Sequence, residues 1–158
     1  MKKFAFLSIL ILTFYLSNIV YAKPYHFQKD YFEFIVDVPN SWSAKKLENG
    51  YRFVSKKDHS RSVSIQFNYN GNNETPEHFA LYLKNQMINN PEPGKTMIPK
   101  QIEKIDWGGP SDVMLTAEIN GVETRFIISH IKNSLVILTI TNTPDDDVNN
   151  IITSLRTK

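Results

Sequence analysis

The chain has 158 residues, of which 22% are charged and 41% are hydrophobic, and it contains no cysteine. This length fits one domain and excludes a multidomain enzyme, and the lack of thiols excludes disulfides, thiolate metal sites and a cysteine nucleophile. When Lys2 and Lys3 are set aside as part of a leader, the remaining basic residues equal the 16 acidic ones. A neutral domain with interspersed charges indicates neither nucleic acid nor an anionic membrane surface as a partner.

The first 22 residues have the pattern of a secretory leader. Lys2 and Lys3 give a positive start, residues 4–16 are mostly apolar, and the segment ends in Ala22, a small residue of the kind that signal peptidase requires. The apolar run is shorter than the about 20 residues that span a bilayer. We therefore expect cleavage after Ala22, a single periplasmic or secreted domain over residues 23–158, and no stable membrane insertion. An uncleaved N-terminal anchor is the alternative.

The first part of the mature chain predicts strands. Apolar and polar residues alternate over residues 31–38 until Pro39 ends the pattern. Residues 43–57, with Asn49-Gly50 at their middle, predict a hairpin with a type I′ turn. Residues 62–69 alternate most regularly, so this strand should have one buried face and one face in contact with solvent.

A helix is predicted from Thr75 to about Ile88, because Thr75 is a suitable N-cap and Pro76 a suitable first helical residue. Its apolar stripe, Phe79, Ala80, Leu83 and Met87, fits packing on a sheet. Residues 97–107 contain few apolar residues and one proline, which favours an edge strand.

The last part of the chain predicts a meander and a second helix. Turns at residues 108–110 and 132–134 flank a hairpin with its turn at Asn120-Gly121, and residues 135–140 are apolar on both faces, as in a central strand covered on both sides. Thr143 and Pro144 repeat the N-cap and proline pattern. Together these elements predict an α+β fold, a largely antiparallel sheet of about six to eight strands sandwiched by two main helices.

The residue types that could bind a metal or a cofactor do not occur at a suitable spacing in this sequence. The histidines have no partner at the spacing of a zinc site, so we expect solvated loop positions for His26 and His59, a first-turn helix position for His78, and a strand shared with Arg125 for His130. Asp145, Asp146 and Asp147 lack the glycine and distal glutamate of a calcium loop, and we expect them to interact with the helix dipole. We expect no metal and no cofactor.

Motifs of catalysis are missing as well, since the chain has no G-x-S-x-G turn, no H-E-x-x-H helix and no phosphate-binding loop. Two carboxylate pairs, Glu33 with Asp37 and Glu118 with Glu123, have the chemistry of an acid and a base, but charges on the wet face of a strand explain them equally. We therefore identify no catalytic, metal-binding or cofactor-binding residue, and the ligand-binding residues are unknown.

Three further residues or motifs have structural interpretations. Trp42 and Trp107 each lie next to a turn, where an aromatic side chain closes the end of a core or forms a recognition surface; we favour core closure. Asn73-Glu74-Thr75 matches a glycosylation sequon, which matters only in a eukaryotic secretory pathway.

The order of these elements resembles the PsbP-like family, whose fold is shared with a nuclear Ran-release factor and with periplasmic domains of unassigned role. The resemblance covers nearly the whole mature chain. It implies an antiparallel sheet between helices and an accessory or binding role without catalysis. Plant members help photosystem II retain ions, but nothing here matches a metal-retaining loop, and the leader resembles a bacterial export signal. The residues that carry the resemblance are Phe34-Ile35-Val36-Asp37-Val38-Pro39 with Trp42, Thr75-Pro76 with Phe79, Gly121 with Arg125, Ile137-Leu138-Thr139, and Ile152-Thr153-Ser154-Leu155.

These observations favour an exported, non-catalytic domain that binds another envelope or extracellular protein, or a small envelope component. Two alternatives remain: a small secreted hydrolase with an active site built from scattered Ser, His and carboxylate residues, and a structural envelope or colonisation factor. A serine within hydrogen-bond reach of His78 or His130, in a deep cleft, would favour the hydrolase.

Overall fold

The computed structural model describes residues 22–29, 32–69, 73–107, 111–131 and 134–157. Their elements, in chain order, are β1 (Ala22–Lys29), β2 (Phe32–Pro39), β3 (Trp42–Leu47), β4 (Gly50–Ser55), β5 (Ser62–Tyr69), α2 (Pro76–Asn89), β6 (Met97–Lys104), β7 (Val113–Ile119), β8 (Val122–Ile131), β9 (Ser134–Thr141), α3 (Asp145–Ile152) and β10 (Arg156–Thr157).

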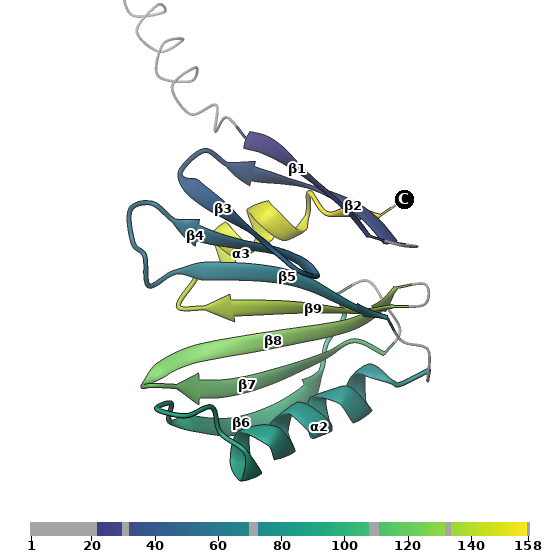
Figure 1. The fold of residues 1–158 in the computed structure, drawn as a ribbon, viewed down its shortest axis with the longest axis vertical. Helices are drawn as coiled ribbons and strands as arrows, with labels where there is room; N and C mark the ends of the chain where they lie inside the picture. The colour runs from purple at the N-terminus through teal and green to yellow at the C-terminus, as the bar shows by residue number, and fades with distance from the viewer. Residues whose placement is uncertain (1–21, 30–31, 70–72, 108–110, 132–133, 158) are drawn as a thin grey trace, which may run out of the picture.

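The strands form two antiparallel sheets (Figure 1). Seven strands lie in the order β3-β4-β5-β9-β8-β7-β6, and a smaller sheet has the order β1-β2-β10. Short connections join most neighbouring strands. The pair of β5 and β9 is the long-range one, since α2 and the β6-β7-β8 meander lie between these two strands in the chain. The predicted α+β class and the antiparallel pairing are confirmed, with β6 at an edge as expected.

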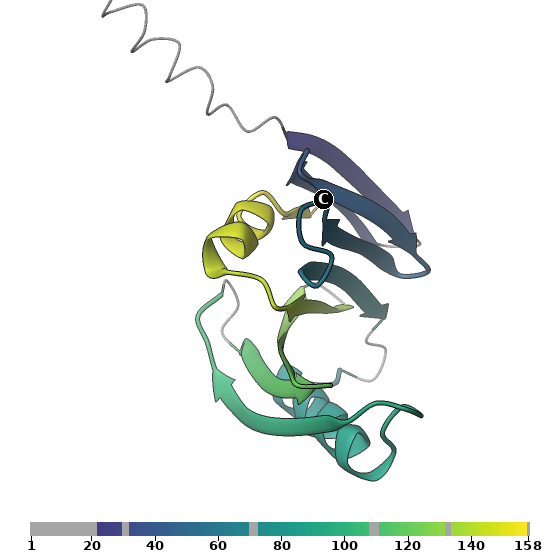
Figure 2. The ribbon, with the colours of Figure 1, turned by 90° about the vertical axis from the view of Figure 1, so that its left-hand side faces the viewer.

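The two helices lie on opposite sides of the seven-stranded sheet (Figure 2). Helix α2 packs on β6, β7 and β8, and its buried Ala80 and Met87 share a core with Leu115 and Ile128. On the other side, α3 and the small sheet cover the main core. Strand β9 contributes to both cores, Val136, Leu138 and Ile140 to one and Leu135 and Ile137 to the other. The predicted doubly covered central strand is therefore confirmed.

Aromatic side chains fill the space between β2 and β5. Phe34 is fully buried, and its ring centroid lies 5.3 Å from that of Phe27 and 4.7 Å from that of Phe67. Val36 and Val38 continue the same buried face of β2, as the alternation predicts. These contacts attach the small sheet to the large one.

The turn predicted at Asn49-Gly50 is wrong by one residue. Leu47 pairs with Gly50, so Glu48 and Asn49 form the turn, and neither has the positive φ that a type I′ turn requires. Gly50 has a different reason to be glycine, because a Cβ at this position would lie 1.9 Å from the carbonyl oxygen of Ile65 on β5. The turn at Asn120-Gly121 is confirmed, with φ of 52° and 78°.

The start of the second helix also differs from the prediction. Helix α3 begins at Asp145 with Pro144 at the N-cap position, and no side chain caps it. The Thr143 hydroxyl, predicted as the cap, instead donates to the carbonyl oxygens of Thr141 and Ser62, at 2.7 and 3.3 Å. Strand β9 continues to Thr141, so Thr143 remains attached to the sheet.

Strands β1 and β10 were not among the predicted elements. Strand β1 pairs with one side of β2 and the short β10 with the other side, where Arg156 lies opposite Ile35. His26 consequently lies on a strand and not in a loop. Some predicted features lie outside the described residues: the leader up to residue 21, Tyr31, and the turns at 70–72, 108–110 and 132–133. Among the helices of the described residues, none is long and apolar enough to cross a membrane.

Candidate functional site

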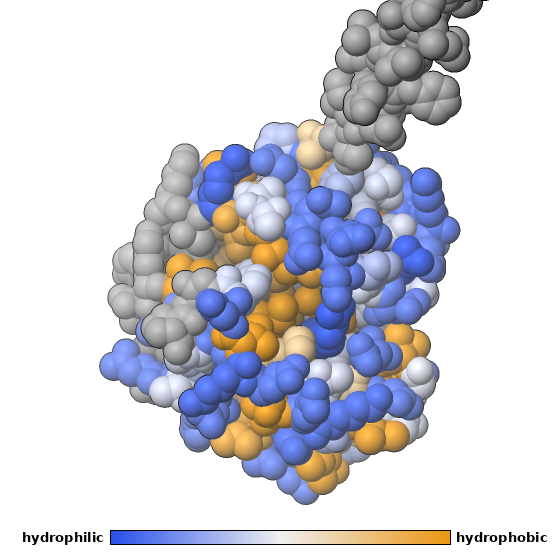
Figure 3. Space-filling model, turned by 180° about the vertical axis from the view of Figure 1, so that it is seen from behind, coloured by the Kyte–Doolittle hydropathy of each residue, from blue (hydrophilic) through white to orange (hydrophobic). Residues whose placement is uncertain are grey.

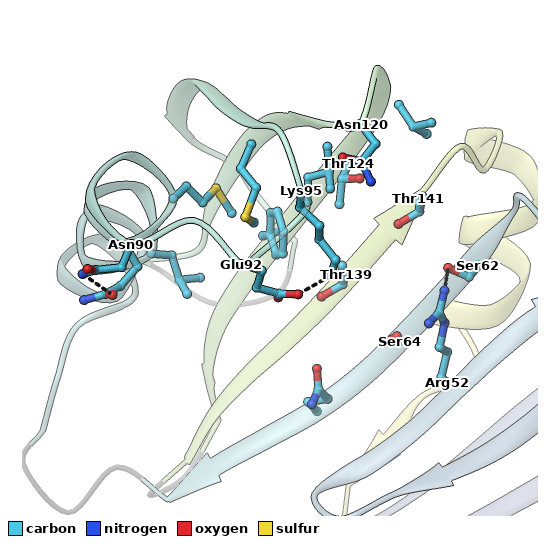
Figure 4. A pocket seen from close by; sticks show the side chains of 18 residues that line it. Arg52, Ser62, Ser64, Asn90, Glu92, Lys95, Asn120, Thr124, Thr139 and Thr141 are labelled. Carbon is cyan, nitrogen blue, oxygen red and sulfur yellow. Dashed lines mark hydrogen bonds and ion pairs between the residues drawn. The ribbon is translucent and has the colours of Figure 1, made fainter.

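A groove of about 650 Å³ opens on the side of the large sheet that carries α2. Its floor is formed by β5, β9 and β8, one wall by the C-terminal half of α2 and the segment after it, and the far side by Arg52 of β4 (Figure 4). This volume lies within the range of about 300–1,000 Å³ that is typical of sites for small molecules.

The groove exists because α2 covers only part of this face. Helix α2 packs on β6, β7 and β8 and leaves β4, β5 and the end of β9 uncovered. The alternation of β5 supplies polar residues to the uncovered area, with Ser62, Ser64 and Gln66 in the groove and Val63 and Ile65 in the main core. The face predicted to contact solvent is thus the floor of a concave site, but Ser62 and Ser64 are buried there, with only 3% and 8% of their surface exposed.

Cross-strand pairing arranges the floor in a row that changes from charged to apolar. Arg52 is paired with Ser64, Ser64 with Thr139, and Thr139 with Phe126. Lys45 extends the row beyond Arg52 on β3. Since directly paired residues of adjacent strands project from the same face, all five side chains belong to one line across the sheet.

The side chains that line the groove form few polar contacts with one another. Nη2 of Arg52 donates to Oγ of Ser62 at 3.3 Å, and Lys95 forms an ion pair with Glu92 above the floor (Figure 4). Among the described residues, neither Arg52 nor Lys45 has a carboxylate partner, and the hydroxyls of Ser64 and Thr139 form no hydrogen bond. The groove therefore offers an arginine and free hydroxyl groups to a ligand.

The wall opposite Arg52 is mainly apolar. Leu83 and Met87 project from α2, Met97 from β6, and Phe126 from the floor. Gln86 and Asn90 lie at the end of the helix, where Nδ2 of Asn90 donates to Oε1 of Gln86 at 3.1 Å. The groove thus combines a polar, cationic side with an apolar side.

The four histidines do not come together. His26 lies 2.7 Å from Glu33, and His78, in the first turn of α2 as predicted, lies 2.9 Å from Glu74. His130 is exposed on β8, the strand of Arg125. Within the described part of the chain, no serine hydroxyl hydrogen-bonds to the ring of His78 or His130, and no group of three or more His, Asp or Glu residues could hold a metal ion. The contact that would favour a hydrolase is therefore missing from this part.

The two candidate carboxylate pairs are distributed over other surfaces. Glu33 contacts His26, and Oδ2 of Asp37 accepts from Arg156 at 2.8 Å. Glu118 and Glu123 are directly opposite each other on β7 and β8, and Glu118 lies 3.4 Å from Lys100. None of the four residues lines the groove.

Two of the three aspartates of α3, Asp145 and Asp147, interact with arginines that line a second, smaller cleft of about 240 Å³. Arg125 donates to Asp145 at 2.6 Å and to the carbonyl oxygen of Thr143, and Arg61 lies 3.7 Å from Asp147. All three aspartates lie in the first turn, where the helix dipole favours them. The expected dipole interaction is supported by the placement, and the arginines of this cleft already have acidic partners.

Arg61 also contacts Asp58, a residue whose pKa is lowered. The hydroxyl and the backbone N–H of Ser60 donate to Oδ1 of Asp58 at 2.6 and 3.0 Å. These hydrogen bonds, helped by Arg61 at 3.1 Å, lower the pKa of Asp58 from 3.8. The shift belongs to a turn between β4 and β5 and not to the groove.

Hydrophobic side chains surround a hollow on the opposite side of the molecule (Figure 3). Trp107, Ile105 and Met114 are partly buried against the main core on this side, whereas Trp42 is 5% exposed within it. Core closure is confirmed for Trp42. Apolar surface also occurs around α2 and β6, where Leu81, Tyr82, Ile88 and Ile98 are each about half exposed.

The groove itself was not predicted from the sequence. The wet face of β5 was recognised, but its neighbours Arg52, Thr139 and Phe126 come from strands far apart in the chain. The polar interruption of β9 at Thr139 and Thr141, within an otherwise apolar strand, was the signal that part of this face stays uncovered.

No family model and no curated protein matches the chain. Solved structures do: cyanobacterial PsbP (CyanoP) from Synechocystis sp. PCC 6803 is similar with a TM-score of 0.62 and 14% identity, over 89% of this chain and 95% of that one. A structure from Bacteroides thetaiotaomicron gives a TM-score of 0.48 at 12% identity, over 79% of this chain and 45% of that one. The fold implied by the sequence resemblance is therefore confirmed: it is PsbP-like.

Proposed function

We propose that this chain is an exported, non-catalytic accessory domain of the cell envelope, and that it binds a small envelope component in the groove beside α2. The observation that carries the proposal is the row of unused hydroxyls and one arginine on the groove floor, opposite an apolar wall. Sites for small molecules typically combine an apolar lining with a few polar groups that fix orientation.

Binding without chemistry agrees with how the groove is lined. Its hydroxyl residues stand beside one another on β5 and β9, and Arg52, which donates to Ser62, does not act as a general base. The carboxylate that lines the groove, Glu92, is held in an ion pair with Lys95. A serine nucleophile needs a neighbouring base to activate it. The hydrolase alternative predicts turnover of a substrate by the purified domain, and we expect none.

The binding proposal is tested with the isotope-labelled domain, residues 23–158, and a small-molecule extract of the bacterial envelope. We expect chemical-shift changes in the amides around Ser64 and Thr139, and none around His26 on the small sheet. Changes confined to the small sheet, or no change with any extract fraction, would contradict the groove as the site.

Export rests on the leader pattern and is tested separately. The full chain, expressed in a Gram-negative host, should be recovered from the periplasm with Lys23 as its first residue. Cleavage there removes only Ala22 from β1. Ala22 pairs with Pro39, the last residue of β2, so the other pairs between β1 and β2 stay available. Recovery of uncleaved protein in the membrane fraction would instead support the anchor.

A protein partner is the second candidate, favoured by the exposed Leu81, Tyr82 and Ile88 of α2 and Ile98 of β6. Exposed apolar groups of this kind, when clustered, mark contact surfaces. Pull-down from an envelope fraction with the wild-type domain and with the Leu81→Ser, Ile88→Ser double variant tests it. One stoichiometric protein that the variant loses would support it, whereas diffuse recovery with wall material from both would support the structural alternative.

A further inference from the structure

We propose that the groove binds a small organic anion with three parts in line: a carboxylate, an amide in the middle and an apolar group at the far end. An N-acyl amino acid and the carboxyl-terminal end of a short peptide both have this chemistry. The inference rests on the proposed function, because it names the ligand class of the same groove.

The charge of the site indicates an anion. Lys45 and Arg52 are directly opposite each other on β3 and β4, and like charges in such positions repel. The described residues of β3, β4, β5 and β9 that share this face include no acidic side chain, and neither cation has a carboxylate partner within the described chain. A ligand carboxylate would relieve the repulsion and form charge-assisted hydrogen bonds with the Arg52 guanidinium.

The middle of the row indicates a neutral polar group. Ser64 and Thr139 are paired across β5 and β9, and their hydroxyls have no hydrogen-bond partner among the described residues. A hydroxyl both donates and accepts, and an amide does the same through its N–H and its carbonyl oxygen. An amide over these two residues would therefore satisfy both.

The far end indicates an apolar group. Phe126 follows Thr139 in the row, and Leu83 and Met87 of α2 line the wall beside it. Burial of apolar ligand surface against these side chains removes that surface from water and so favours binding. A ligand of charge and polar groups alone would leave this wall in contact with water.

The spacing of the strands sets the length of the ligand. The Arg52 side chain reaches across to Ser62 of β5, so its guanidinium lies over that strand, whereas Phe126 belongs to β8. Strands β5, β9 and β8 are consecutive neighbours, and two strand spacings are about 10 Å. Because Ser62 lies two residues along β5 from Ser64, the carboxylate and the apolar group should be separated by somewhat more than this distance.

The experiment uses N-phenylacetylglycine as the probe and its neutral carboxamide, which has the same shape without the charge, as the matched ligand. Binding is measured by NMR titration and calorimetry on the domain of residues 23–158. We expect the acid to bind at least about tenfold more tightly than the carboxamide, since only the carboxylate forms a hydrogen bond between opposite charges with the Arg52 guanidinium.

The variants separate the parts of the site. Arg52→Gln should weaken the acid at least about tenfold and leave the carboxamide nearly unchanged, and Thr139→Val should weaken both a few-fold. Arg156→Gln is the control, because it removes an arginine of the small sheet whose partner is Asp37. Thermal unfolding of each variant establishes that it is folded before its affinity is compared.

The outcomes also distinguish this inference from the proposed function. Equal affinity for acid and carboxamide, or no effect of Arg52→Gln, overturns the anion and leaves the groove as a site. No binding of either probe overturns the ligand class, and an envelope extract that still shifts the groove amides would then keep the proposed function. With the anion supported, N-octanoylglycine and acetyl-leucyl-glycine distinguish a lipid source from a peptide source by which binds more tightly.

Discussion

Successive side chains of β5 point alternately into the main core and into the groove, which are two different environments. Val63, Ile65 and Phe67 are enclosed by the small sheet and α3, whereas Ser62 and Ser64 form the floor of the groove. The difference comes from what covers each face and not from β5 itself, because α2 stops short of this strand. One face stabilises the domain, and the other has unused polar groups for a ligand.

The comparison is tested most strongly by adjacent substitutions on the two faces. Ile65→Ala should lower the free energy of unfolding by about 4 kcal/mol, because it removes buried methyl groups and leaves a cavity in the main core. Ser64→Ala, one residue away, should change it by less than about 0.5 kcal/mol. Urea denaturation measures both, and similar costs would show that the groove face also stabilises the fold.

A glycine on β4 tests how closely the strands approach. Gly50→Ala places a methyl group against the backbone of Ile65, which neither strand can avoid without moving, and should cost about 2–3 kcal/mol. Gly121→Ala is the matched control, since its surroundings are open and only its φ of 78° is unfavourable, for about 1 kcal/mol. Equal costs would contradict the close approach.

The cap of α2 tests how independent the groove wall is from the main core. The Thr75 hydroxyl accepts from the N–H of His78 at 3.2 Å, and Thr75→Ala should cost about 1 kcal/mol, while Thr75→Ser should be nearly neutral. Hydrogen exchange of the α2 amides should increase more than that of the β5 amides. A uniform increase would mean that helix and sheet open together.

The smallest effect is expected at Asp58, on the turn that joins β4 to β5 and contacts α3 through Arg61. Because hydrogen bonds from Ser60 lower the pKa of Asp58 from 3.8, the charged form stabilises the folded state above pH 3.8 and this contribution is lost as the pH falls below it. Asp58→Asn should therefore be slightly less stable than wild type near neutral pH. Chemical denaturation at a series of pH values checks that the difference vanishes in acid.

The sequence predicted most of the fold, because alternation and capping are local. Periodicity located β2, β5, β7, β8, β9 and α2 within a few residues, and the apolar character of β9 on both faces predicted its central place. Strand β10 was missed because two residues carry no pattern, and β1 because its polar residues face solvent on an edge. Gly50 was interpreted as part of a turn because its contact with Ile65 is a tertiary one.

The candidate site was harder to predict than the fold. Its row of side chains depends on the registers of β4 with β5, β5 with β9 and β9 with β8, and a shift of one residue in any of them would move a side chain to the other face. The sequence identified the polar face of β5 but not its neighbours. The titratable residues that drew attention in the sequence lie elsewhere, several of them in ion pairs, such as Glu33 with His26, Glu118 with Lys100 and Asp145 with Arg125.

The position of β2 between β1 and β10 has a mechanical consequence. Both neighbours run antiparallel to β2, with Ala22 beside Pro39 at one end and Thr157 beside Phe34 toward the other. A force that pulls these two outer strands apart by their ends would load both ladders in shear, so that several hydrogen bonds resist together. The two-residue ladder of β10 would yield first, and we expect forced extension to begin at that end of the domain.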